Sequence, residues 1–569
     1  MGSEIGKKRK NLYPARLSVH GLRLGLLGGL MLASLEALLR YLPAHAGTDL
    51  SAGALLPVVS GITLALPAAF LGLAHPAAAA AVIVAVGSVG GGAVGGGLAV
   101  AAAGLAWVLS RSGWQSAAAV LGMLLGGVAL RSPPSGSCEA PVVVLAVMDT
   151  VGASATSLHG ATLPTTPALE ALAARGVVFD AAISPAPWTL PAHAAMFTGQ
   201  PARTVGGHHE QLALSADVPT LAQRLSEAGW RTGAFVANPW IGRRTGMTRG
   251  FHHQEHHSEI SAAGATFSVL SLLPVSRNKG GRALVKRALS WISHCEGQPS
   301  FVFLNLLEAH SPFHQIADPG RFDVADPERI SQRMAAVQLR GPIGAAGFPE
   351  DGEIEAARRV YAAGVAEADA LIGAVAAALP DAAMLVTADH GEAFGEHGFF
   401  GHMIGIHAEV LAVPLVVVGP GVVPSRIAAP VSTVRVYDTL LQLAGLPGPD
   451  SLLSGDYSAP VFSEQLRPVL KLADLGEDAA DWMDSRQSRV QVGDDVLVRR
   501  EPSAGPIQWW QYDQATDPGE TQSTWTPDSA SELTALLTDY LDEPLSEGEG
   551  VELDDVMRAQ LHALGYVEP

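Results

Sequence analysis

The stretch Leu385–His402 reads LVTADHGEAFGEHGFFGH, and the rest of the chain is organised around it. The apolar run that leads into it, Ala382–Val386, predicts a buried strand. Asp389 and His390 follow at once, so a carboxylate and an imidazole stand side by side at the carboxyl end of that strand. Open α/β sheets bind ligands at this edge. The pair therefore predicts half of a metal site.

Two other apolar runs end in the same way. Pro141–Val147 has the continuous apolar character of a strand buried on both faces, and it leads to Asp149. Ser300–Leu307 is a similar run and leads to His310. The alternative for Leu385–His402, a polar loop with scattered histidines, does not account for this repetition. Strands that alternate with helical stretches predict an α/β layered domain.

Composition divides the chain into a membrane part and a soluble part. Only 16% of the 569 residues are charged, and the mean hydropathy is +0.24. The amino-terminal leader is basic, so the net charge of −19 must lie in the remainder. An acidic soluble part argues against a nucleic-acid partner, because affinity for nucleic acid rests on Lys and Arg that neutralise phosphates.

Residues 1–131 are predicted to form a helical transmembrane region of four or five spans. Ala77–Leu109 is too long for one crossing of a bilayer about 30 Å thick, and two Gly-Gly-Gly runs could divide it. No span carries the paired carboxylates of a proton relay, which disfavours a transporter. The apolar segments are Leu22–Leu42, Leu50–Leu73, Ala77–Leu109 and Trp114–Leu130.

The number of spans decides on which side of the membrane the soluble part lies. The basic leader places the amino terminus in the cytoplasm. Five spans then put the rest of the chain outside, whereas four keep it inside. We expect an integral, multi-pass protein of a bacterial inner (cell) membrane, with the lipid bilayer as a partner and an extracytoplasmic catalytic domain.

Residues 132–140 are rich in Ser, Pro and Gly and are expected to be a linker. The two cysteines, Cys138 and Cys295, lack the spacing of a zinc ribbon, and the sequence leaves open whether they pair. Clustered histidines could form a second metal site, but their spacing favours a solvated loop. These histidines are His208, His209, His252, His253, His256 and His257.

A hydroxyl at a helix start offers a candidate nucleophile. In SPAPWTLPAHAAMFTGQ, residues 184–200, Thr189 follows a Pro-rich approach, and His193–Phe197 could continue as a helix. A hydroxyl just before a helix lies among free backbone N–H groups, which suit an oxyanion. The alternative is that Thr189 is only an N-cap, a common role of threonine.

With these residues in view, the chain resembles the sulfatase family of the alkaline phosphatase superfamily. This resemblance implies an α/β/α sandwich with a mixed central sheet, in which 141–465 is the catalytic domain and 466–569 a C-terminal subdomain. The motifs run in order: VVLAVMDT at 143–150, LPTTPALEALAARGVVF at 163–179, TLPAHAAMFTG at 189–199, DVPTLAQRLSEAGWRTGAFVAN at 217–238, FVFLNLLEAHSPF at 301–313, DHGEAFGEHG at 389–398, VPLVVVGPG at 413–421, YDTLLQLAGLP at 437–447, YDQATDPGET at 512–521 and LHALGYVE at 561–568.

The resemblance implies one divalent metal ion, and the ligand types suit Zn²⁺, Mn²⁺ or, less well, Ca²⁺. It makes Thr189 both a ligand and the nucleophile. His310 and His402 match positions that contact the ester group, so they are expected to bind substrate and to act in catalysis. The implied metal ligands are Asp149, Thr189, Asp389 and His390.

The chain departs from the family at several positions. Sulfatases carry Cys or Ser in a C/S-x-P-x-R motif, and an enzyme oxidises that residue to formylglycine. Here Thr189 replaces it and cannot yield the aldehyde by the same chemistry. His193 replaces the arginine and is a further catalytic candidate. His402 stands where many sulfatases place a lysine and phosphoethanolamine transferases a histidine, and Gly152 lies where another arginine is usual.

The sequence thus predicts a membrane-anchored, metal-dependent hydrolase or phosphotransferase. It would cleave a phosphate or sulfate ester through Thr189 and a covalent intermediate, with a phosphoester favoured. Two alternatives remain: a true sulfuric-ester hydrolase, and an inactive sulfatase-like binding protein. The predicted spans make a lipid headgroup or an envelope glycan plausible as the substrate.

Overall fold

The computed structural model describes residues 140–257, 279–338, 349–403, 405–467, 482, 484–529 and 531–546. The chain divides into two compact units, residues 1–135 and 136–569. The predicted spans lie outside the described residues. Within the described part, α13 (Asp351–Ala378) is the one helix long and apolar enough to cross a membrane. Because 67% of its apolar window is buried, it has the features of a core helix.

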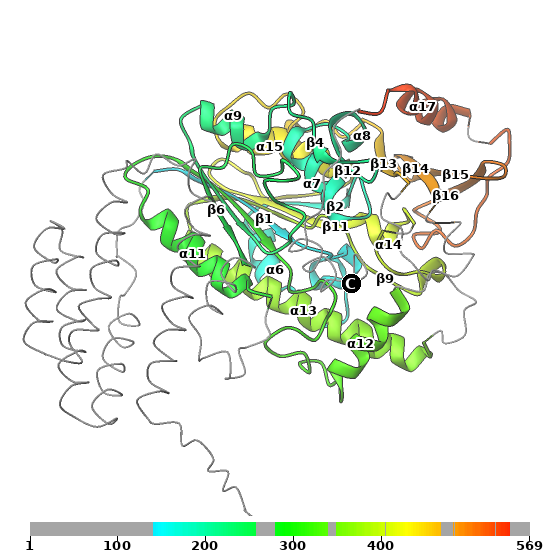
Figure 1. Cartoon of the computed structure of the whole chain (residues 1–569), viewed down its shortest axis with the longest axis horizontal. Coiled ribbons are helices and arrows are strands. Elements are labelled where there is room, and N and C mark those ends of the chain that lie inside the picture. The colour runs from blue at the N-terminus through cyan, green and yellow to red at the C-terminus, as the bar shows by residue number, and fades with distance from the viewer. Residues whose placement is uncertain are drawn as a thin grey trace, which may run out of the picture. The chain divides into compact units, whose positions relative to one another are not determined.

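A mixed eight-stranded sheet lies at the centre of the second unit (Figure 1), in the order β12-β2-β11-β8-β1-β7-β5-β6. β11 runs antiparallel to both of its neighbours, and every other neighbouring pair is parallel. This confirms the predicted mixed sheet. The strands are β1 (Val142–Met148), β2 (Val177–Ile183), β5 (Arg231–Val236), β6 (His253–His256), β7 (Ser300–Leu306), β8 (Ala383–Thr387), β11 (Ala412–Val418) and β12 (Ser425–Ser432).

Helices cover both faces of this sheet, which explains why its central strands are continuously apolar. Every residue of β1, β7 and β8 is buried. Figure 1 shows the two helical layers on opposite sides of the strands. One layer holds α6 (Pro167–Ala173), α11 (Gly281–Ser293), α12 (Pro327–Gln338) and α13; the other holds α7 (Thr189–Thr198), α8 (Ala202–Val205), α9 (Leu221–Glu227) and α15 (Val436–Leu443).

A second, antiparallel sheet follows towards the carboxyl terminus and is covered by a helix, α17 (Ser531–Asp542). Leu533 and Leu537 of α17 pack against Val490 and Leu497 of this sheet. It begins at Val461, a few residues before the predicted domain boundary at 465. Its strands are β13 (Val461–Gln465), β14 (Ser485–Val492), β15 (Asp495–Pro502) and β16 (Gln508–Asp513).

Two local predictions differ from the structure. The prediction of a solvated loop for the later histidine cluster is wrong for residues 253–256, which form the edge strand β6 beside β5. Backbone pairing with Gly233–Val236 overrides the polar side chains there. The helix that carries the nucleophile candidate begins at Thr189 itself, with Trp188 as its N-cap. Its start therefore lies four residues before His193.

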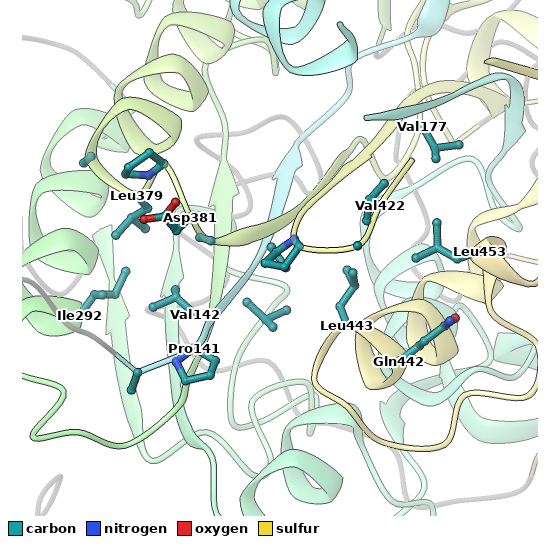
Figure 2. A pocket seen from close by; sticks show the side chains of 18 of the residues that line it. Pro141, Val142, Val177, Ile292, Leu379, Asp381, Val422, Gln442, Leu443 and Leu453 are labelled. Atoms are coloured by element: carbon teal, nitrogen blue, oxygen red, sulfur yellow. The ribbon is translucent and has the colours of Figure 1, made fainter. Parts of the chain in front are cut away.

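A cavity of about 1020 Å³ opens at the amino ends of the central strands (Figure 2). Val142 of β1, Val177 of β2 and Leu443 of α15 are among its mostly apolar walls, and Asp381 is the one charged residue among the described residues that line it. Ligand sites of α/β sheets lie at the opposite, carboxyl edge. This cavity is therefore separate from the polar residues that follow the strands.

Gly364 allows α13 to pass directly against the turn after β7. A Cβ atom at this position would lie 2.5 Å from the carbonyl oxygen of Glu308 and 3.0 Å from the Cα of Ala309. Both of those atoms belong to backbone, so neither can move without displacing the turn that carries His310.

We expect Gly364→Ala to lower the free energy of unfolding by about 1–3 kcal/mol through overpacking, although alanine favours an exposed helix by about 1 kcal/mol. Gly352→Ala in the same helix is the control, because a Cβ there meets no atom within 4 Å. Thermal melting of the full-length chain compares the two variants. Equal melting temperatures for the two variants would show that the close contact at Gly364 does not limit the stability of the protein.

Candidate metal centre and active site

The polar residues that follow β1, β8, β7 and β5 meet at one edge of the sheet. Asp149 follows β1, Asp389 and His390 follow β8, and His310 follows β7. Thr189 reaches the same place from the start of α7, and its Oγ1 lies 3.5 Å from His390 Nε2. All five side chains are fully buried. The structure thus brings together the residues that the strand ends predicted.

Two carboxylates and an imidazole form a ligand set of the kind that divalent metals bind. The ligand atoms of Asp149, Asp389 and His390 lie within 4.8 Å of one another. Asp149 Oδ1 and Asp389 Oδ2 are buried and have no hydrogen-bond partner. His390 Nδ1 lies 3.0 Å from the Gly391 carbonyl, to which it must donate, so Nε2 keeps its lone pair for a metal. These residues fit a metal ion.

The other oxygen of each carboxylate is held by the protein. Asp149 Oδ2 accepts hydrogen bonds from Asn238 Nδ2 at 3.0 Å and Asn305 Nδ2 at 2.9 Å. Asp389 Oδ1 accepts from the backbone N–H groups of Thr150 at 3.1 Å and His390 at 3.0 Å. Each carboxylate is therefore fixed on one side and available on the other.

Without a cation nearby, burial leaves the negative charges of Asp149 and Asp389 poorly compensated. It raises the pKa of Asp149 to about 7, and the neighbouring Asp389 adds to the rise. It also raises the pKa of Asp389 to about 7, against the hydrogen bonds that the carboxylate accepts. For His390, burial and then the nearby His402 lower the pKa to about 4, so the imidazole is neutral and able to coordinate.

Sequence reasoning missed Asn238, which holds the hydroxyl of Thr189. Asn238 Nδ2 donates to Thr189 Oγ1 at 3.1 Å as well as to Asp149. Its own Oδ1 accepts from Trp240 N at 3.0 Å, which fixes the amide orientation. Because Thr189 accepts from Asn238, its own proton can be directed towards the Asp389 carboxylate, whose pKa Thr189 lowers. The available signal was the position of Asn238 just after β5.

His193 lies next to Thr189 and Asp389. Its Nδ1 lies 2.8 Å from the Thr189 carbonyl and 3.6 Å from Asp389 Oδ2. Phe197 and Phe303 pack edge-on against its ring, and burial lowers its pKa to about 3. These contacts suit a neutral imidazole that holds the first turn of α7. A direct catalytic role for His193 stays a prediction.

His310 and His402 form the wall beside the metal ligands. Their ring centroids are 5.1 Å apart, and those of His402 and His390 are 4.5 Å apart. His402 Nδ1 lies 3.0 Å from Glu392 Oε2. Burial lowers the pKa of His402 to about 4 and raises that of Glu392 to about 8, so the pair shares a proton near neutral pH.

Lys279 is a buried cation that the sequence did not reveal. Its Nζ donates to the carbonyl oxygen of His310. Burial lowers its pKa to about 7, whereas nearby Glu308 is the strongest opposing influence. Glu308 Oε1 also accepts from the N–H of Gly281 at 3.0 Å. The start of α11 is thereby tied to the turn that carries His310.

The histidine clusters do not form a second metal centre in the described part of the chain. Asp149, Asp389 and His390 are the only ligand group found there. His209 stacks on Trp188, and its Nδ1 contacts the Leu466 carbonyl at 3.0 Å. His253 pairs with Glu255. Cys295 is buried and disulfide-bonded; Cys138, the other cysteine of the sequence, lies outside the described residues.

Comparisons with known proteins agree with this arrangement. The sequence profile of the Sulfatase family matches residues 141–446. Arylsulfatase K of Homo sapiens is 24% identical over 406 residues, covering 64% of this chain and 74% of the relative. Arylsulfatase K of Canis lupus familiaris is 24% identical over 387 residues, covering 61% of this chain and 70% of the relative.

Solved structures share the fold. The phosphonate monoester hydrolase of Agrobacterium radiobacter superposes with a TM-score of 0.55 at 18% identity, covering 70% of this chain and 94% of that one. The phosphonate monoester hydrolase of Silicibacter pomeroyi gives a TM-score of 0.53 at 21% identity, covering 71% and 94%.

We expect metal affinity to fall as the pH drops from 8 to 6. Asp149 and Asp389 have pKa values of about 7 without metal, so protons compete with the cation below that pH. Each displaced proton weakens binding about tenfold per pH unit below the pKa. Calorimetric titration of the full-length protein with Zn²⁺ and Mn²⁺ measures this. Asp389→Asn should bind far more weakly than Asp438→Asn, a control on α15; equal binding would contradict the site.

Proposed function

Because the chain belongs to the sulfatase family of ester hydrolases, we propose that it is a metal-dependent hydrolase or transferase that uses Thr189 as its nucleophile. The observation that carries this proposal is the position of Thr189 Oγ1. It accepts a hydrogen bond from Asn238 at 3.1 Å and lies 3.5 Å from His390 Nε2, one of the three candidate metal ligands. A threonine that only capped a helix would need none of these partners.

The residues of this site suffice for the first chemical step. A divalent metal held by Asp149, Asp389 and His390 would lower the pKa of the Thr189 hydroxyl and offset charge on the ester. The hydroxyl proton has the Asp389 carboxylate as its acceptor. Thr189 Oγ1 attacks phosphorus in line, the bond from phosphorus to the leaving oxygen breaks, and its electron pair stays on that oxygen.

The pair of His402 and Glu392 is placed to protonate the leaving oxygen. His402 Nε2 gives up its proton, and Nδ1 takes the proton shared with Glu392. His310, held by Lys279, is the alternative donor. Water, in a hydrolase, or a second alcohol, in a transferase, then displaces Thr189 from phosphorus and restores it.

Charge favours esters with one negative charge. Two carboxylates, Asp149 and Asp389, line the site, and the nearby buried amine of Lys279 donates to the His310 carbonyl. One divalent ion cannot offset these groups and a doubly charged phosphate monoester as well. A phosphodiester or a phosphonate monoester carries one charge less. The shared fold with phosphonate monoester hydrolases supports this choice.

A sulfate ester is the second candidate, because it also carries one charge and the curated relatives include arylsulfatase K. Thr189 argues against it, since threonine cannot become formylglycine. A membrane anchor formed by residues 1–131 is part of the proposal, with a lipid headgroup or envelope glycan as substrate. The disulfide at Cys295 supports an extracytoplasmic site, because disulfides persist in oxidising compartments.

We expect Thr189→Ala to lower kcat about a thousandfold or more, since it removes the nucleophile itself. Full-length protein in detergent, loaded with Mn²⁺ or Zn²⁺, is assayed with bis(4-nitrophenyl) phosphate, 4-nitrophenyl phosphate and 4-nitrophenyl sulfate. The diester should be turned over fastest.

Two variants control this experiment. Thr189→Ser should retain measurable turnover, because the hydroxyl remains, and Thr198→Ala at the other end of α7 should behave as the parent. Full activity of Thr189→Ala would rule out the nucleophile. Faster turnover of the sulfate than of the diester would favour the sulfatase alternative.

A further inference from the structure

The C-terminal motif YDQATDPGET, residues 512–521, reaches the loop that carries His402. That loop is a short hairpin of β9 (Ala393–Phe394) and β10 (Phe400–Gly401). Glu392 immediately precedes β9, and His402 immediately follows β10. Their 3.0 Å contact therefore closes the base of the hairpin. The opposite end, the tip, is the turn Glu396–Gly398.

Glu520 is presented to this tip by a preformed turn. Its backbone has a φ of 52°, in the left-handed region that glycine usually occupies. Its N–H donates to the Asp517 carbonyl at 3.0 Å, and the Asp517 carboxylate accepts from Gln522 N at 2.8 Å and Thr521 Oγ1 at 3.0 Å. A strained residue held by several bonds indicates that its position matters.

The Glu520 carboxylate is buried and fully engaged. Oε1 accepts from Arg489 Nη2 at 2.6 Å and from Gln514 Nε2 at 2.5 Å. Oε2 lies 3.1 Å from His407 Nδ1 and accepts from Ala408 N at 3.3 Å. Arg489 and Gln514 belong to the C-terminal sheet region, whereas His407 and Ala408 belong to the catalytic part. Glu520 thus joins the two.

His397, at the tip of the hairpin, is held from both sides. Its Nδ1 lies 2.9 Å from Glu409 Oε1, and its Nε2 lies 3.0 Å from the backbone carbonyl of Glu520. Since neither acceptor can donate when Glu409 is ionised, both ring nitrogens donate and the ring is an imidazolium. The ring stacks on His407, with centroids 3.8 Å apart and planes 11° apart.

Most charges around the tip are paired, and Glu396 of the tip itself pairs with Arg358 of α13. His397 and Arg489 carry positive charge, and Glu409 and Glu520 carry negative charge. Asp517 also faces His397 electrostatically. An apolar contact accompanies this cluster, because Phe399, the residue after the tip, packs edge-on against Trp482 with ring centroids 5.1 Å apart.

We propose that Glu520 is a positioning residue of the active site. Its carboxylate anchors the turn to Arg489 and His407, and its backbone carbonyl, set in place by that anchor, holds His397. The turn thereby fixes the hairpin whose two ends carry Glu392 and His402. Glu520 touches neither the metal ligands nor the nucleophile, so it acts through His402. The catalytic domain thereby depends on a turn more than a hundred residues further along the chain. The kinetic part of this inference rests on the proposed function.

A double-mutant cycle tests whether Glu520 acts through His402. Glu520→Gln keeps the side-chain volume but loses the charge, and we expect kcat for bis(4-nitrophenyl) phosphate to fall about tenfold with KM nearly unchanged. In the His402→Ala background the same change should lower kcat less than about twofold. Equal losses in both backgrounds, or no loss in the parent, would overturn the proposal.

The matched control is Glu210→Gln. Glu210 also binds an arginine of β14, Arg486, at 2.9 Å, but it does not contact the hairpin. This variant should keep the parental kcat in both backgrounds. A loss as large as that of Glu520→Gln would show that any contact to the C-terminal sheet has the same effect, and would overturn the specific role of Glu520.

A second measurement does not depend on the reaction. Hydrogen–deuterium exchange of the full-length protein should be faster in peptides covering 391–403 for Glu520→Gln, and unchanged there for Glu210→Gln. If Glu520→Gln does not fold, His397→Gln replaces the ring that bonds the Glu520 backbone carbonyl. It interrupts the next contact in the same chain of support and should give the same two results. Unchanged exchange in 391–403 would overturn the proposal even if the protein lacks measurable esterase activity.

Discussion

Two carboxylates buried side by side are the constraint on which this structure depends. Asp149 and Asp389 are both inaccessible to solvent, and each leaves one oxygen without a partner. Buried like charges are costly unless a cation or hydrogen bonds compensate them. The protein provides amide donors, Asn238 and Asn305, on one side and a neutral imidazole, His390, on the other. A divalent metal ion would complete this set.

The same constraint explains a strained backbone beside the centre. Thr150 has a φ of 63°, unusual for a β-branched residue. This conformation turns its N–H towards Asp389 Oδ1, and the hydroxyl of Tyr361 on α13 donates to its carbonyl at 2.6 Å. The strained backbone of Thr150 thus helps to hold the Asp389 carboxylate. Strained residues of this kind cluster at functional sites.

The sequence was sufficient for the parts that follow directly from strand patterns. Asp149, Asp389 and His310 follow apolar runs, and parallel strands bring such positions together. Asn305 could not be found in this way, because it lies inside β7 and reads as one polar residue in an apolar strand. Lys279 precedes α11 and reaches the site only through the packing of that helix.

Other predictions depended on strand pairing and side-chain packing, which a single sequence indicates only weakly. The edge strand with His253 has a polar sequence, and its pairing with β5 is a tertiary effect. His193 was assigned to catalysis by analogy with an arginine. Its hydrogen bond to the Thr189 carbonyl and its aromatic neighbours Phe197 and Phe303 depend on three-dimensional packing.

The two halves of the site differ in how they are held. The candidate metal ligands follow β1 and β8, which are paired over several residues in a buried sheet. Rigid elements place side chains more accurately than loops do. His402 instead lies on a hairpin of two short strands, and His310 lies on a turn against Gly364. The two histidines proposed to protonate the leaving oxygen therefore lie on less rigid elements. Contacts from Lys279 to the His310 carbonyl and from Glu520 to the tip of the hairpin support those elements.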